Sequence, residues 1–154
     1  MNIRPALFDR LAQLLVLYER IRIEAFAAAV SAEDLNGLEI PGRNLGIWDC
    51  LRRLFVTQSE FASALHKLSQ TEEYKLAERK FEKDREMRTL IATVSKASRH
   101  FHTHRAKLCG ASRIAAAGIT GTPTTDAICL AREGFAHATQ AMHALVAAFV
   151  CDRI

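Results

Sequence analysis

The chain is poor in the residues that interrupt helices. It holds only three prolines and seven glycines in 154 residues, and many of them cluster at Pro41-Gly42 and between Gly118 and Pro123. No stretch alternates apolar and polar residues over the length of a strand. Because the tracts between these breakers are rich in Ala, Leu, Arg and Glu, they favour helix over strand. The sequence therefore predicts an all-α fold.

Other absences bear on the cellular location. The chain has no CxxC pair, and its cysteines are far apart, so we expect reduced thiols. Asp9 and Arg10 interrupt the first apolar run, which argues against a signal peptide. No run approaches the ~18 uncharged apolar residues of a membrane span. We therefore expect a cytoplasmic protein without a membrane partner. The four cysteines are Cys50, Cys109, Cys129 and Cys151.

Apolar residues recur at alternating steps of three and four in four long segments, which is the pattern of amphipathic helices. The segments lie at about 5–30, 45–68, 87–110 and 122–149. The intervening stretch 71–88 is highly charged and is expected to be a mostly solvated helix with a bend near Asp84. Helices of this kind are satisfied by a shared core. We expect a single domain, residues 1–154, forming a mostly antiparallel four- to five-helix bundle.

Several residues make this arrangement more specific. Gln58 interrupts the apolar stripe of the second helix and lies either at its edge, which we favour, or in a bond across the bundle. The small residues Gly134 and Ala138 would let a neighbouring helix approach the last helix closely. Gly110 is expected to end the helix that begins near Met87.

The first helical segment and the start of the charged stretch carry further local signals. Phe8, Leu15 and Phe26 widen the apolar stripe of the first helix, as expected of a helix packed against two neighbours. Residues 69–72, Ser-Gln-Thr-Glu, have the capping-box pattern and could start a new helix directly.

The charge balance favours a polyanionic partner. The formal net charge is +4 and the isoelectric point is near 9.1. Arginine supplies 15 of the 21 basic residues and lysine the other six. Arginine forks suit phosphate recognition, although arginine-rich composition also arises without any such function.

The densest group of ionisable residues is Arg99 to Arg105, within the segment 87–110. His104 continues the apolar stripe that includes Phe101. His100 and His104 are four residues apart and could both reach a metal. A closed site would need further ligands from distant residues, and the inward positions of the other helices are apolar, so we expect no metal. The three remaining histidines are expected at surface or boundary positions: His66, His137 and His143.

Arg99, His100 and His104 resemble the signature of HEPN domains, which is an arginine, a polar residue, three arbitrary residues and a histidine. HEPN domains are small all-α bundles. Many are metal-independent ribonucleases of toxin–antitoxin, abortive-infection or CRISPR systems, and others are inactive binding domains. The resemblance implies RNA as the partner, no cofactor, and a homodimer that completes the site. In a toxin system it also implies an antitoxin protein as a second partner.

The resemblance assigns a role to each residue of the motif. His104 would be the acid/base, because histidine titrates near neutral pH. Arg99 would hold the phosphate and His100 would orient the site. Arg105 and Lys107 would add contacts to the RNA backbone. The alternative is a helical interaction module without chemistry, such as a regulator or an accessory factor of a mobile element.

Overall fold

The computed structural model describes residues 4–34, 43–116 and 125–149. Within these ranges the chain forms five α-helices and no strand, which confirms the predicted all-α fold. The helices are α1 (Arg4–Asp34), α2 (Arg43–Ser69), α3 (Glu72–Lys80), α4 (Arg85–Ala116) and α5 (Thr125–Phe149).

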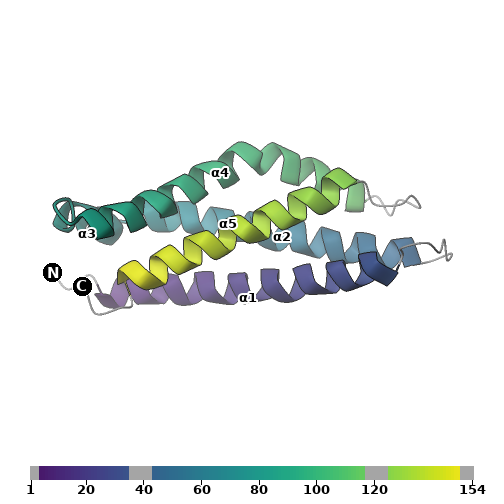
Figure 1. Cartoon of the computed structure of the whole chain (residues 1–154), viewed down its shortest axis with the longest axis horizontal. Coiled ribbons are helices and arrows are strands. Elements are labelled where there is room, and N and C mark those ends of the chain that lie inside the picture. The colour runs from purple at the N-terminus through teal and green to yellow at the C-terminus, as the bar shows by residue number, and fades with distance from the viewer. Residues whose placement is uncertain (1–3, 35–42, 117–124, 150–154) are drawn as a thin grey trace.

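The four long helices form an elongated bundle in which neighbours run antiparallel (Figure 1). α1 and α4 lie on opposite sides of the bundle, and α2 and α5 each pack against both of them. The short α3 joins α2 to α4 at one end. None of the described helices is long and apolar enough to cross a membrane.

The core is one continuous apolar cluster that receives a stripe from every long helix. In α4 the predicted stripe is correct, and its members Met87, Val94 and Phe101 are buried. Aromatic contacts tie the helices together: the Phe61 and Phe101 rings meet edge-on at 5.7 Å between α2 and α4. Burying such large apolar side chains stabilises the fold by roughly 1.5–3 kcal/mol each.

The ends of the helices differ from the predicted ends in two places. The N-cap of α3 is Thr71 rather than Ser69, and its hydroxyl accepts a hydrogen bond from the Tyr74 amide at 3.3 Å. α4 continues past Gly110 to Ala116, so the prediction that this glycine ends the helix is wrong. A single glycine inside a helix costs about 1 kcal/mol relative to alanine, which a long packed helix can accommodate.

The predicted bend near Asp84 is present and has a capping geometry. The Asp84 side chain accepts hydrogen bonds from the amides of Glu86 and Met87 at 3.1 and 3.2 Å. These bonds satisfy two of the amides that a helix start leaves without partners. Asp84 therefore caps the N-terminal end of α4, which begins at Arg85.

Gln58 lies at the centre of the bundle, fully buried, so the favoured prediction of an edge position is wrong. Its Nε2 donates to the Ala131 carbonyl oxygen of α5 at 2.9 Å. The alternative prediction, a bond across the bundle, is the correct one. Gly134 provides the necessary space, because a Cβ there would lie 2.3 Å from Gln58 Oε1.

Phe8, Leu15 and Phe26 are not buried against a second neighbour as predicted. They are 39%, 49% and 71% exposed. α1 does contact both α2 and α5, but it does so with its other stripe, in which Leu7 and Leu14 are buried. The low polarity of the outer side of α1 therefore needs a separate explanation.

Replacing Gly134 with alanine should destabilise the protein by about 1–2 kcal/mol, because the new methyl group displaces the buried Gln58 amide and its bond to α5. The sign should reverse in a Gln58→Ala background. There the space is open, and alanine in a helix is favoured over glycine by roughly 0.5–1 kcal/mol. Urea unfolding of the four proteins of this cycle measures both effects. An equal cost of Gly134→Ala in both backgrounds would show that the two residues are not coupled.

Tyr74 of α3 is buried, and its ring lies 5.8 Å from that of Phe149. Burial, with a smaller contribution from the Glu78 carboxylate, raises the pKa of the Tyr74 hydroxyl. The Ser95 side chain acts in the opposite direction and lowers this pKa, but the effect of burial is larger. The folded state therefore retains this proton at a pH where the unfolded chain, with the ordinary tyrosine pKa of about 10, has released it.

The stability that Tyr74 contributes should thus be complete below about pH 10 and decrease as the pH rises further, by up to about 1.4 kcal/mol per pH unit. Tyr74→Phe should remove this part of the alkaline decrease. Thermal melts between about pH 8 and 11 compare the two proteins. Tyr18→Phe, which removes the only other tyrosine, should keep the wild-type pH dependence. A wild-type alkaline slope in Tyr74→Phe would contradict the prediction.

Candidate nucleic-acid interface

One face of α4 is basic along most of its described length. Arginine or lysine occurs at spacings that return to the same side of the helix, with Ala92 and Thr103 between them. At 100° per residue all of these basic residues fall within an arc of about 100°. All are exposed. They are Arg85, Arg88, Lys96, Arg99 and Lys107, and we call them the α4 basic face.

The orientation of this face follows from the core. Met87, Val94 and Phe101 fill the space between α2 and α5, and on a helical wheel they lie opposite the α4 basic face. Burying the apolar stripe therefore turns the basic side chains to solvent. The direction of the face is fixed by packing rather than by any contact of the charges themselves.

The charges of the α4 basic face are not neutralised within the described part of the chain. Glu86 is the only acidic residue of α4. The ion pairs among the described residues join side chains of α1 and α2, such as Arg22 with Glu19 at 2.9 Å and Arg53 with Asp49 at 3.2 Å. None involves the α4 basic face. Uncompensated positive charge of this kind attracts polyanions.

Two of the residues predicted from the sequence, Arg99 and Lys107, belong to this face. They are two turns apart, about 12 Å along the axis. His104 and Arg105 lie in α4, but their side chains are outside the described residues. Their predicted roles stay predictions.

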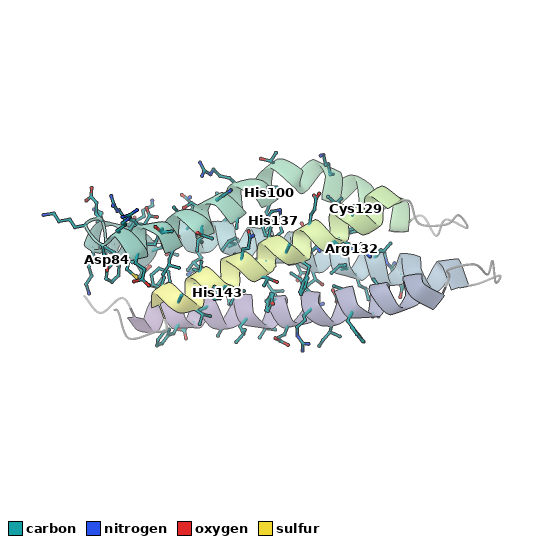
Figure 2. All side chains as sticks on the ribbon, in the orientation of Figure 1. Asp84, His100, Cys129, Arg132, His137 and His143 are labelled. Carbon is teal, nitrogen blue, oxygen red and sulfur yellow. The ribbon has the colours of Figure 1, made fainter. Side chains whose placement is uncertain are left out.

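His100 is turned toward α5, where Figure 2 shows it beside His137. Its ring contacts His137, with the two ring centroids 3.5 Å apart and the planes inclined by 39°. His137 also meets Phe101 edge-on at 6.1 Å. The Nε2 atom of His100 is buried. The two imidazoles therefore form part of the α4–α5 contact, and in this arrangement the Nε2 of His100 does not face a ligand at the surface.

The contact of His137 with His100 was not predicted, but the boundary position predicted for His137 is confirmed. His66 and His143 are exposed, as expected. Arg85, Arg88 and Lys96 were also not predicted to be members of one surface. Their spacing relative to Arg99 was visible in the sequence, because basic residues can be tested for helical periodicity in the same way as apolar ones.

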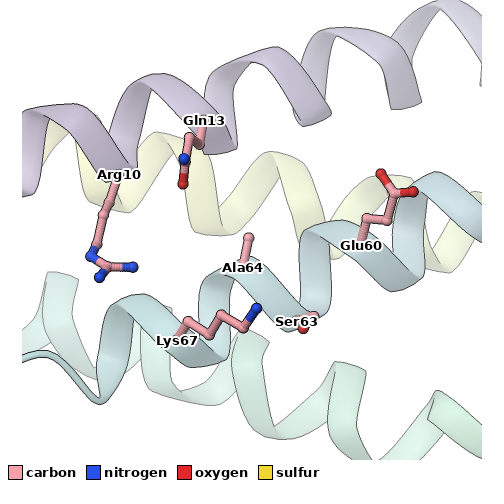
Figure 3. A pocket seen from close by; sticks show the side chains of 6 residues that line it. All are labelled: Arg10, Gln13, Glu60, Ser63, Ala64 and Lys67. Carbon is pink, nitrogen blue, oxygen red and sulfur yellow. The ribbon is translucent and has the colours of Figure 1, made fainter.

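Elsewhere the structure offers a groove between α1 and α2 with a volume of about 270 Å³ (Figure 3). Its charged lining residues are Arg10, Glu60 and Lys67, and the rest are Gln13, Ser63 and Ala64. It contains no histidine or cysteine and no paired carboxylates. No group of three or more metal-ligating side chains occurs among the described residues.

Comparison of the chain with known protein families, with curated proteins and with solved structures found no match.

Proposed function

We propose that this protein binds RNA through the α4 basic face. The observation that carries the proposal is that five exposed basic side chains share one side of a helix that has a single acidic residue. Sequence-independent nucleic-acid binding depends on such uncompensated charge, because each neutralised phosphate releases counterions. The net charge of +4 also favours binding of a polyanion.

The dimensions of the face suit a nucleic-acid backbone. From Arg85 to Lys107 the helix axis extends about 33 Å at 1.5 Å per residue. This is the length of about ten phosphates along one strand of B-form DNA, at 3.4 Å per phosphate. The face holds no exposed aromatic residue between Arg85 and Arg99. It therefore favours contacts to phosphates over stacking on bases.

The choice of RNA and the hypothesis of cleavage both rest on the HEPN resemblance of Arg99, His100 and His104. On an ideal helix Arg99 and His104 are about 140° apart. One copy cannot easily direct both side chains at a single phosphate, so cleavage would require a second copy to complete the site. Binding by the α4 basic face has no such requirement, and the two activities can be tested separately.

Binding is predicted to be strongly salt-dependent. If five phosphates are neutralised, a plot of the logarithm of the affinity for a single-stranded RNA against the logarithm of the salt concentration should have a slope of about −3.5. The triple variant Arg88→Gln, Lys96→Gln, Arg99→Gln should reduce the slope by about 2 units and weaken binding uniformly across sequences. Fluorescence anisotropy with labelled RNA of about 20 nucleotides measures both.

The matched control removes three basic residues from other surfaces: Arg10→Gln, Lys67→Gln, Lys75→Gln. All three residues are exposed, so the net charge changes by the same amount while α4 is untouched. The control should retain most of the affinity. Equal losses in both triple variants would show that only net charge matters. Tighter binding of duplex DNA than of any RNA would contradict the choice of RNA.

The ribonuclease hypothesis predicts that the purified protein cleaves RNA in EDTA. His104→Ala should abolish cleavage, since acid–base catalysis by histidine typically contributes about 10²–10⁴-fold. Arg99→Ala should reduce cleavage similarly through loss of charge stabilisation. Lys107→Ala should lower RNA affinity without abolishing cleavage. Equal activity in wild type and His104→Ala, or RNA binding without cleavage, would leave a binding protein without chemistry.

A further inference from the structure

α1 carries a second apolar stripe on its side away from the core. Five of the seven large apolar side chains that are exposed among the described residues belong to it, and the other two, Val56 and Val146, lie singly on α2 and α5. The stripe follows the helix for about 27 Å. Its members, with their exposed fractions, are Phe8 (39%), Leu15 (49%), Val16 (61%), Ile23 (60%) and Phe26 (71%).

The area of this outer α1 stripe is comparable to that of the largest apolar patch on a typical monomer, which is about 300–600 Å² and is often functional. A large apolar side chain presents about 150–250 Å² when fully exposed, so at these fractions the five together present on the order of 500 Å². Patches of this size on soluble chains are often interaction sites. Two such stripes facing each other would bury roughly 1,000 Å² in total, which is the lower size of a specific interface.

The one charged residue within the stripe is already neutralised. Glu19 accepts hydrogen bonds from Arg22 Nε at 3.1 Å and Nη2 at 2.9 Å. These bonds raise the pKa of Arg22. Since the pair is satisfied inside its own helix, Glu19 can lie within an apolar contact without requiring a charge on the other side.

We propose that a second copy of this chain covers the outer α1 stripe, with the two α1 helices antiparallel and the two-fold axis passing between Leu15 and Val16. In this register Leu15 meets Val16 of the partner subunit, and Phe8 meets Ile23 of the partner subunit. The small Ala12 lies opposite Glu19 of the partner subunit and leaves room for its pair with Arg22. Four of the five members of the stripe thus meet a member of the partner subunit's stripe, as a two-fold interface requires.

The charges beside the stripe favour the antiparallel direction. Asp9 and Arg20 lie along the same edge of the stripe at 100° per residue. An antiparallel pair places Asp9 of each copy within about one helical turn of Arg20 of the partner subunit. A parallel pair would instead place the edges that carry Asp9 and Arg20 on opposite sides of the interface, so that these opposite charges could not meet across it. Arg20 is held only loosely within its own chain, at 4.0 and 3.9 Å from Glu24 and Glu60.

Sedimentation velocity and light scattering over about 1–100 μM test the proposal on the full chain, and we expect a dimer in this range. Leu15→Glu with Ile23→Glu should raise the dimer dissociation constant by about 100-fold or more, because each copy then buries unpaired charges. Circular dichroism should show unchanged helix content, since both residues are solvent-exposed in the single chain. A wild-type monomer throughout this range would overturn the proposal.

The control variant Val56→Glu with Val146→Glu introduces the same number of charges at exposed valines outside the stripe, and it should leave the dimer intact. Asp9→Arg and Arg20→Asp should each weaken the dimer severalfold, and the double variant should restore it. Weakening by the valine control as much as by the α1 variant would overturn the proposal. A double charge variant weaker than either single variant would overturn the antiparallel arrangement.

This inference does not depend on RNA binding. α1 and α4 lie on opposite sides of the bundle, so the α4 basic faces of such a dimer point outward. The α1 glutamate variants should therefore retain RNA affinity per chain if RNA binding is correct. Failure of RNA binding would leave the dimer prediction unchanged.

Discussion

Burial of the apolar stripe of α4 determines which side of this helix faces solvent, and therefore where the α4 basic face lies. The stripe fits between α2 and α5 because its members recur on a single side of the helix. Once Met87, Val94 and Phe101 are buried, the opposite side must face solvent, and it is there that the basic residues lie. The basic side chains of α4 are therefore oriented without the help of ion pairs or of a loop. It follows from the phase relation between two patterns on one helix, an apolar one and a basic one.

The fold was largely predictable because the same logic applies to each long helix. Apolar periodicity identified the stripes of α2, α4 and α5, and polar caps separated α3 from its neighbours. The failures have physical causes. The unfavourable helix propensity of Gly110 predicts a helix end, but tertiary packing over a long helix outweighs a cost of about 1 kcal/mol.

Gln58 shows a different limit of sequence reasoning. An amide in an apolar stripe can be at the edge or at the centre, and local pattern does not distinguish the two. The deciding residue is Gly134, far away in the sequence, whose missing side chain leaves the space that the amide occupies. The sequence shows that Gly134 is small, but its pairing with Gln58 depends on the register between α2 and α5. That register is a tertiary property.

The candidate site was predicted in part for a similar reason. Arg99 and Lys107 were identified through a short motif, which gave them roles in catalysis and in RNA contacts. The structure joins them instead to residues up to 14 positions upstream of Arg99 through the repeat of the helix, Arg85 being the farthest. His100, which the motif places beside Arg99, is turned toward His137. A motif describes neighbours along the chain, whereas a helix face is made of residues separated by three, four and seven positions.

The two exposed faces also constrain each other. A ribonuclease site built from Arg99 of one copy and His104 of another requires the two α4 helices to approach. An interface through the outer α1 stripe keeps them apart, because α1 and α4 are diagonal in the bundle. Such a dimer would still present two basic faces to one long RNA. Tethering two weak sites raises the apparent affinity without any new contact, provided that the strand can reach both. Geometry that separates the α4 helices therefore favours binding of extended RNA over a shared catalytic site.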